Sequence, residues 1–197
     1  MPLEPWELPE LGTKAMVGPA LATGPVGIGE RHDDPWARRF VIDCLKGGSV
    51  KKLFLELPST GQKAVDMIEG TTDTKLARLM ISGACGHPQS PGNPVQLADL
   101  IIEAKAAGIP VWAADSPLMT NSRTSFEDRH KCVRLTYLEK SKGGKGCLLL
   151  WGKDHFTDQD HPLTNYISGL RYYNFTTSME DGVPPPPPRP LPPLPPR

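Results

Sequence analysis

The chain has 197 residues, and its 22 basic and 22 acidic side chains give a formal net charge of zero. This length suits one compact domain with an appendage, and the charge balance offers no electrostatic basis for binding nucleic acid or an anionic membrane. No apolar run approaches the roughly 20 residues that cross a bilayer, so no transmembrane segment is expected. The acidic start, MPLEPWELPELG, is unlike a cleaved signal peptide. This predicts a protein that is cytoplasmic, or secreted into a host cell without a cleaved signal.

Apolar, strand-like runs alternate along the chain with segments of helical periodicity. Buried strands are expected at 26–29, 52–57, 109–115 and 145–151, with a further short strand near 172–176. Helices are expected from Pro35 to before Gly47, around 74–81, from a cap at Asn93-Pro94 to Gly108, and from a cap at Ser125 to about 142, with an amphipathic turn at 163–170. Strands separated by helices imply parallel pairing with right-handed crossovers. The predicted fold class is α/β: a three-layer domain with a mainly parallel sheet of four to five strands flanked by helices.

Proline marks the C-terminal boundary, since 10 of the 23 prolines lie in the last 14 residues. Each proline fixes φ and removes a backbone donor, which predicts a disordered polyproline tail. The expected domains are therefore an N-terminal extension at 1–23, the α/β domain at 24–182 and the tail at 183–197. Arg189, Pro192 and Pro195 fit one orientation of an SH3 ligand, and Pro192, Pro195 and Arg197 fit the other. An SH3 or WW partner for 184–197 is one prediction, and a simple spacer is the alternative.

Polar side chains end the four main predicted strands. The first strand ends in Gly29-Glu30-Arg31-His32 and the fourth in Gly152-Lys153-Asp154-His155, so two strand ends share the pattern G-x-x-H. Glu56 and Asp115 lie at the ends of the second and third strands. Because parallel sheets place ligands beyond the carboxyl ends of their strands, these groups are expected on one edge. His130 and His161 are interpreted as surface residues, and His87 as part of a proline-broken loop.

These motifs, taken in order, resemble a known family. The chain resembles the Tiki / ChaN / erythromycin-esterase-like superfamily over about residues 24–176. The resemblance rests on residues 29–35 (GERHDDP), the strand ending in Glu56, residues 108–115, an arginine at 129 and residues 148–155 (LLLWGKDH). Its members include macrolide esterases, metal-dependent proteases with paired G-x-x-H motifs and haem-iron lipoproteins, and related domains occur in bacterial toxins and effectors. The chain is far shorter than the esterases and shows no lipoprotein signal, which disfavours macrolide hydrolysis and haem uptake.

The resemblance implies a hydrolase of ester or peptide bonds, acting as a bacterial effector or toxin-type member. Its catalytic candidates are Glu30, His32, Glu56, Arg129 and His155. In one mechanism His32, His155 and a carboxylate, Glu56 or alternatively Glu30, bind Mn, Co or Zn, which activates water, and Arg129 stabilises the oxyanion. In the other no metal takes part: one histidine, polarised by Glu56, is the general base and the second protonates the leaving group.

Each candidate also has a structural alternative. His32 and Asp115 would serve as helix or turn caps, Glu56 would pair with Arg38, Arg39 or Arg129, and Glu30 and Arg129 would be solvated charges. Two other functions also fit the sequence. The domain would bind haem iron without turnover, using a phenolate of Tyr137, Tyr166, Tyr172 or Tyr173, or it would act as an adaptor that recruits partners through its tail.

Overall fold

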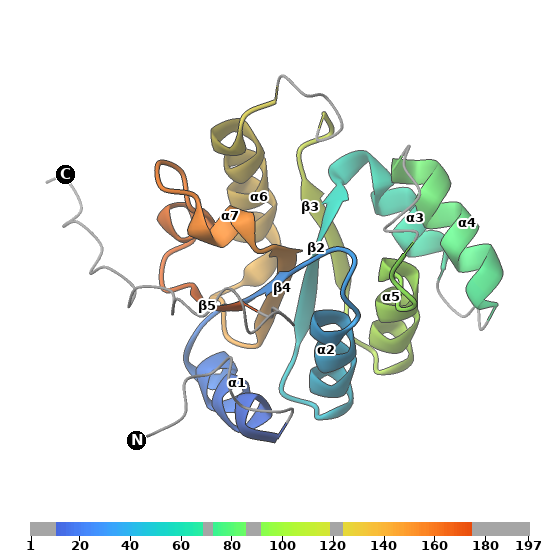
Figure 1. Cartoon of the computed structure of the whole chain (residues 1–197), viewed down its shortest axis with the longest axis horizontal. Helices are drawn as coiled ribbons and strands as arrows, with labels where there is room; N and C mark the ends of the chain where they lie inside the picture. Colours follow the sequence, from blue (N-terminus) through green and yellow to red (C-terminus); the bar gives the residue numbers. More distant parts are fainter. Residues whose placement is uncertain (1–10, 69–72, 86–91, 119–123, 175–197) are drawn as a thin grey trace, which may run out of the picture.

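A computed structural model describes residues 11–68, 73–85, 92–118 and 124–174 (Figure 1). Five strands form one sheet in the order β3-β2-β4-β1-β5, and every neighbouring pair is parallel. The strands are β1 (Val26–Glu30), β2 (Lys52–Pro58), β3 (Val111–Asp115), β4 (Cys147–Gly152) and β5 (Arg171–Asn174). The helices are α1 (Leu11–Thr23), α2 (Trp36–Lys46), α3 (Gln62–Met67), α4 (Thr74–Cys85), α5 (Leu97–Ala106), α6 (Phe126–Ser141) and α7 (Asp154–Thr157), with 3-10 turns at Ser59–Gly61 and Leu163–Asn165. The predicted α/β class with a parallel sheet is confirmed.

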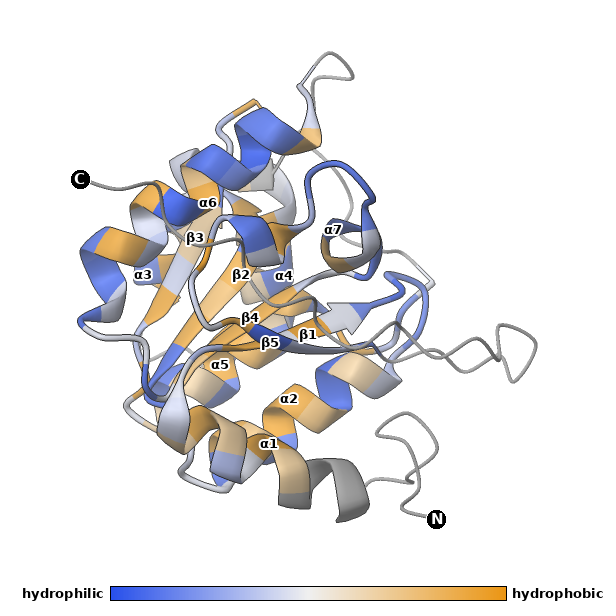
Figure 2. Ribbon diagram, turned by 90° about the vertical axis from the view of Figure 1, so that its left-hand side faces the viewer, coloured by the Kyte–Doolittle hydropathy of each residue, from blue (hydrophilic) through white to orange (hydrophobic). Residues whose placement is uncertain are grey.

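Both faces of the sheet are covered, because β4 contributes side chains to two separate hydrophobic clusters. Leu148 and Leu150 belong to the cluster that contains residues of α1, α2, α4 and α5, whereas Leu149 and Trp151 belong to the cluster with residues of α6 and α7. Successive side chains of a strand point to opposite faces, so an uninterrupted apolar run suits a strand buried on both sides. Figure 2 shows the apolar central strands between these two groups of helices. The fold is therefore three-layered, as predicted.

Helix α1 lies within the segment that was predicted to be an N-terminal extension. Its residues Val17, Ala20 and Leu21 are buried in the same hydrophobic cluster as the sheet, so this helix packs onto the domain. The predicted tail at 183–197 lies outside the described residues, and the domain boundaries stay predictions. Within the described ranges, no helix has the length and apolar character needed to cross a membrane.

The two long helices that flank β3 begin differently. Helix α6 follows the prediction: the Oγ atom of Ser125 accepts the backbone N–H of Asp128 at 3.2 Å, and the helix ends at Ser141 before the left-handed Lys142. Helix α5 begins later than predicted, because Gln96 rather than Asn93 is its N-cap, and the Asp99 carboxylate accepts the Gln96 N–H at 2.8 Å. Asn93 is thus available for contacts elsewhere.

Strands β1 and β4 bring the two G-x-x-H segments side by side, although about 120 residues separate them in sequence. The strands are adjacent and parallel, with Gly29 opposite Trp151 and Glu30 opposite Gly152. Beyond the strand ends, the Lys153 N–H donates to the Glu30 carbonyl oxygen at 2.9 Å. Both segments therefore leave the same edge of the sheet at the same level.

Candidate functional site

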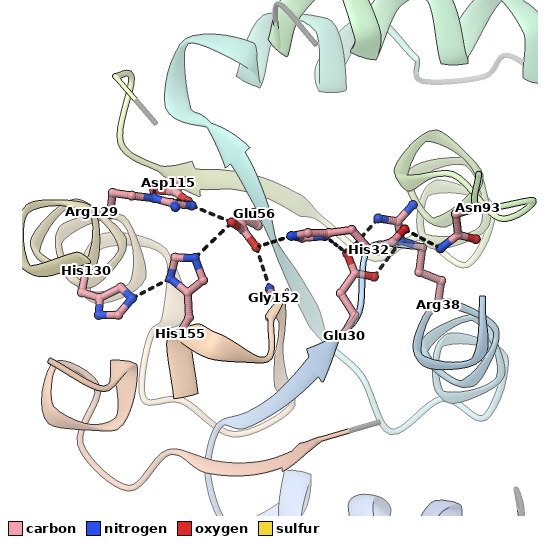
Figure 3. Close-up of polar contacts among 10 residues, drawn as sticks. All are labelled: Glu30, His32, Arg38, Glu56, Asn93, Asp115, Arg129, His130, Gly152 and His155. Carbon is pink, nitrogen blue, oxygen red and sulfur yellow. Dashed lines mark hydrogen bonds and ion pairs between the residues drawn. The ribbon is translucent and has the colours of Figure 1, made fainter. Parts of the chain in front are cut away.

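Charged side chains from six elements and one turn meet at the carboxyl edge of the sheet (Figure 3). We call this group the edge cluster. It includes all five residues that were predicted to be catalytic, and their roles stay predictions. The edge cluster consists of Glu30, His32, Arg38, Glu56, Asp115, Arg129 and His155.

Glu30, at the end of β1, holds His32 on one side and Arg38 on the other. Its Oε1 atom lies 2.9 Å from His32 Nδ1 and 2.8 Å from an Arg38 Nη atom, and its Oε2 atom accepts Arg38 Nε–H at 2.7 Å. Arg38 projects from α2 and is 1 % exposed, while Glu30 is 3 % exposed. Glu30 is therefore a buried, bidentate ion-pair partner, and the solvated-charge alternative for it is wrong.

This pairing sets the state of both groups. Burial disfavours the charged form of Glu30, but the hydrogen bonds from Arg38 and His32 outweigh it and lower the pKa of the carboxyl group. The hydrogen bond to Glu30 raises the pKa of His32, although burial acts in the opposite direction. Because a carboxylate only accepts, His32 Nδ1 carries a proton and donates it to Glu30. Neutral His32 therefore presents its bare Nε2, on a side chain that is 55 % exposed.

Glu56, near the end of β2, lies at the centre of the edge cluster, as Figure 3 shows. Its Oε1 atom is 2.6 Å from an Arg129 Nη atom and 3.1 Å from His155 Nε2. Its Oε2 atom accepts the Gly152 N–H at 2.6 Å and lies 3.9 Å from His32 Nε2. Burial opposes ionisation of Glu56, yet the charges of His155, His32 and Arg129 lower its pKa. Glu56 is therefore a carboxylate whose oxygens are both engaged.

Arg129 comes from the first turn of α6 and connects two strand ends. It binds the Asp115 carboxylate through Nε and an Nη atom, and Glu56 through the same Nη atom. Burial disfavours its charge, but these two carboxylates raise its pKa further above the usual value. The solvated-helix alternative for Arg129 is wrong, because its guanidinium is engaged by two buried carboxylates. Asp115, which has no exposed surface, binds Arg129 and also accepts the backbone N–H of Ser116 at 2.6 Å, a contact of the kind that the cap alternative expects.

A line of hydrogen bonds continues from His155 into the protein. His155 Nδ1 lies 2.7 Å from His130 Nε2, and His130 Nδ1 lies 2.8 Å from the backbone oxygen of His161. His130 has no exposed surface, so the expectation that it is a surface residue is wrong. The Phe126 ring stacks on the His155 ring at 4.3 Å between centroids. Burial and the charge of His155 lower the pKa of His130 to about 4.

A side chain is excluded at the glycine of each G-x-x-H motif, but the steric reason differs between Gly29 and Gly152. A Cβ atom on Gly29 would overlap the Asn174 side chain and lie 3.1 Å from Lys153 Cα, which is backbone of the other motif. A Cβ atom on Gly152 would lie 3.1 Å from His32 Nε2 and 3.5 Å from Glu56 Oε2. The first glycine thus permits close packing of the strand ends, and the second leaves space for the imidazole.

Asn93 and His130 were not predicted to contact this site, and Arg38 was considered only as a partner of Glu56, whereas it binds Glu30. Asn93 Nδ2 donates to the backbone oxygens of His32 at 3.1 Å and Asp34 at 2.9 Å, which ties down the turn that carries His32. The detectable signal for Arg38 was its place on the inner face of an amphipathic helix that begins near His32. His87 lies outside the described residues, and His161 is partly exposed, with its Nδ1 atom 3.2 Å from the hydroxyl of Tyr166.

The arrangement around Glu56 does not fit a divalent cation. Arg129 already places a positive charge 2.6 Å from Oε1, and Gly152 occupies Oε2. In the part of the chain that the structure describes, no three His, Cys, Asp or Glu side chains are grouped so that they could hold a metal ion. Zinc ligands surround the ion at about 2 Å, which would require Glu56 to exchange its present partners. Binding of Mn, Co or Zn stays an untested prediction.

The tyrosines that were considered for haem have other partners. Tyr137 packs against Phe54, Tyr172 stacks on Phe156, Tyr166 contacts His161, and Tyr173 packs against the hydrophobic cluster that contains Leu148 and Leu150. A cavity of about 650 Å³ lies between α4 and the start of α5. Of the residues drawn in Figure 3, only Asn93 lines this cavity, so the cavity is separate from the edge cluster. Haem binding stays a prediction.

Comparisons with known proteins give one informative likeness. No family model and no curated protein matches the chain. Among solved structures it is similar to the type III effector HopBA1, with a TM-score of 0.59, 14 % sequence identity, and coverage of 80 % of this chain and 79 % of that chain. At this identity the likeness shows a shared fold. The assignment to the Tiki / ChaN / erythromycin-esterase-like superfamily is not supported by these comparisons and stays a prediction.

Proposed function

We propose that the edge cluster is the active site of a hydrolase that cleaves an ester or peptide bond by general acid–base catalysis without a metal. The observation that carries this proposal is the Glu30–His32 pair. Glu30 fixes the Nδ1–H tautomer of His32 at 2.9 Å and thereby leaves Nε2 as the basic atom of a half-exposed imidazole. A carboxylate that orients a histidine in this way is a recurring arrangement in enzymes that activate a nucleophile.

In the proposed reaction, His32 Nε2 takes a proton from water while the water oxygen attacks the carbonyl carbon of the substrate. The resulting imidazolium then gives this proton to the leaving group as its bond to the carbonyl carbon breaks. Glu56 favours the transient imidazolium, because its Oε2 atom lies 3.9 Å from Nε2. The polarising carboxylate in this scheme is Glu30, in place of Glu56, which was predicted for that role.

Arg129 and His155 support Glu56 in this scheme. Arg129 binds Glu56 and Asp115 at the same time, and His155 is 4 % exposed and faces Glu56. Both hold the central carboxylate in place. Stabilisation of an oxyanion by Arg129 remains a proposal, for which the proximity of its guanidinium to the site is the support.

We also propose that the chain acts as an effector inside a host cell, for which its fold likeness to the type III effector HopBA1 is the support. The test is expression of the wild type and of His32→Ala inside a eukaryotic host such as yeast, with cell growth as the readout. If the wild type slows growth and His32→Ala does not, the effect on growth depends on the edge cluster. Equal growth with both, at equal protein levels, would contradict an effector role that depends on this site.

The hydrolase proposal is tested with a panel of ester and peptide substrates. We expect the wild type to cleave at least one class and His32→Ala to lose about 10²–10⁴-fold in rate, the usual contribution of a general base. Because the His32 side chain is half exposed, its removal should leave the thermal midpoint nearly unchanged. His161→Ala is the matched control, since it removes a partly exposed imidazole outside the edge cluster. Equal rates for His32→Ala and the wild type would refute the proposal.

A further inference from the structure

The ring of His32 is held between two carboxylates, but little of its own surface is packed. Its Nδ1 atom lies 2.9 Å from Glu30 Oε1, and its Nε2 atom lies 3.9 Å from Glu56 Oε2. The side chain is half exposed, so contacts with neighbouring side chains enclose only part of it. The place of the ring therefore depends on the backbone of residues 31–34, which we call the His32 turn.

The His32 turn is bound from a segment that is distant in sequence. Asn93, which is 2 % exposed, donates from Nδ2 to the backbone oxygens of His32 at 3.1 Å and of Asp34 at 2.9 Å. The Val95 N–H in turn donates to Asn93 Oδ1 at 2.9 Å. Because a backbone N–H can only donate, this contact fixes the oxygen of the Asn93 amide toward Val95. Both N–H groups of the amide nitrogen are thereby directed at the His32 turn, as Figure 3 shows for its side facing the site.

Arg38 fixes the segment that contains Asn93 relative to Glu30. Its Nε atom and one Nη atom donate to the Glu30 carboxylate, and its other Nη atom donates to the backbone oxygen of Val95 at 2.9 Å. The same buried guanidinium thus connects the carboxylate that orients the His32 ring with the segment that binds the His32 backbone. Ring and backbone are held in one connected frame.

We propose that Asn93 is a positioning residue that fixes the His32 turn and, through it, the direction of the His32 ring. Asn93 does not act on a reacting atom, because its donor bonds end on backbone oxygens. A misplacement of about 1 Å caused by a change away from the chemistry can lower a rate by about 10²-fold. The consequence for the reaction rests on the proposed function, whereas the hold on the turn does not.

The first experiment needs no substrate: amide hydrogen exchange of the full-length wild type and of Asn93→Ala. The amides that report on the turn are those of Asp34, which donates to the Arg31 oxygen at 3.0 Å, and of Trp36, which donates to Asp34 Oδ1 at 2.9 Å. We expect both to exchange at least about tenfold faster in Asn93→Ala, because two buried hydrogen bonds to the turn are lost. Unchanged exchange at these amides would overturn the proposal.

Gln62→Ala is the matched control for the loss of a bridging amide. Gln62 Nε2 donates to the Val111 oxygen at 3.1 Å, and its Oε1 atom accepts the Ala113 N–H at 2.7 Å, so it ties α3 to β3 outside the edge cluster. This variant should leave exchange in the His32 turn and the rate of hydrolysis unchanged. Neither substitution adds a charge, so a difference between them reflects the position of the backbone.

The second experiment measures the reaction on a substrate that the wild type cleaves. We expect Asn93→Ala to lower kcat by about 10–10²-fold and to change KM by less than about twofold. Because Asn93 acts through His32, the double variant of His32→Ala and Asn93→Ala should be no slower than His32→Ala alone. If Asn93→Ala slows both backgrounds by the same factor, its role is merely structural and the proposal is wrong.

The remaining outcomes are also decisive. If Asn93→Ala does not fold, Asn93→Ser replaces it: a hydroxyl has one proton and can donate to only one of the two carbonyl oxygens. Its effects on exchange and kcat should have the same direction and a smaller size, and the absence of both would overturn the proposal. If the wild type cleaves no substrate, the catalytic role fails together with the proposed function, while hydrogen exchange still confirms or refutes the hold on the turn.

Discussion

Glu30 neutralises a guanidinium that has almost no contact with water, so its charge is important for folding as well as for the site. Glu30→Gln would leave Arg38, which is 1 % exposed, without its bidentate carboxylate. Breaking a buried pair by removing one partner costs about 3–5 kcal/mol, and we expect a loss of this size in the free energy of unfolding, measured with urea. Glu103→Gln is the control, because its pair with Lys46 at 3.4 Å is exposed and should contribute less than about 1 kcal/mol. Equal losses for the two variants would contradict the buried pairing.

The pH dependence of the reaction follows from the state of His32. A general base acts in its neutral form, and Glu30 raises the pKa of His32 above 6.5. Activity should therefore fall as the pH decreases through this raised pKa, which places the acidic limb of the kcat/KM profile above pH 6.5. The measurement is a pH–rate profile on a substrate that the wild type cleaves. An acidic limb well below pH 6 would show that a different group is the base.

Some residues of the site could be predicted from the sequence, and others could not. His32 and His155 follow buried strands and Glu56 lies near the end of one. Because the ends of parallel strands share one edge, the meeting of these residues could be anticipated from their order alone. His130 is surrounded in sequence by charged residues (EDRHK), which suggested an exposed helix face. Only the packing of α6 on the sheet decides that its side chain points inward.

At the scale of elements, the repeated G-x-x-H pattern combines two separate steric requirements. We expect Gly29→Ala to destabilise the fold by about 1–3 kcal/mol, because the new methyl group meets the Lys153 backbone at 3.1 Å. Gly152→Ala should reduce stability less than Gly29→Ala does but reduce activity more, because its methyl group meets the His32 ring, which can move aside. Chemical unfolding and hydrolysis rates on the same samples measure both effects.

Gly83→Ala provides the control for these substitutions. Gly83 lies in α4, where an added Cβ atom meets nothing within 4 Å, and alanine favours a helix over glycine by about 0.5–1 kcal/mol. This variant should be as stable as the wild type or slightly more so, with unchanged activity. If Gly29→Ala behaves in the same way, the close approach of the two motifs is not a constraint on the fold.

The strands were easier to predict than the helices. A short, continuous apolar run such as 147–151 is typical of a strand that is buried on both faces of a parallel sheet. By contrast, α1 contains Gly18 and Pro19, which weaken helical propensity, and it is stable only because its apolar residues pack onto the sheet. The start of α5 was misplaced because Asn93-Pro94 resembles a cap, whereas Gln96 and Asp99 form the capping box. Caps of this kind depend on contacts that a local pattern does not specify.

At the scale of the whole molecule, the proline-rich tail is expected to work independently of the edge cluster. A peptide of residues 184–197 should bind some SH3 domains with roughly micromolar affinity, about 8 kcal/mol. Because Arg189 and Arg197 serve opposite orientations, either single alanine substitution should leave one orientation available, and the double substitution should remove the charge contact from both. Fluorescence polarisation against a panel of SH3 domains measures this. Unchanged binding of the double variant would indicate a spacer, as would the absence of any binding.

The position of β4 between β1 and β2 has a consequence for how the protein is synthesised. A growing chain that ends before Cys147 can pair β2 with β3, but β1 has neither of its neighbours, β4 and β5, at that point. The central strand is thus among the last to emerge, and its contacts with β1 and β2 span much of the sequence, which is characteristic of slow folding. Gly152 and His155 arrive with this strand. The edge cluster therefore cannot form during early translation, and the catalytic activity that we propose for it would appear only once nearly the whole domain has left the ribosome.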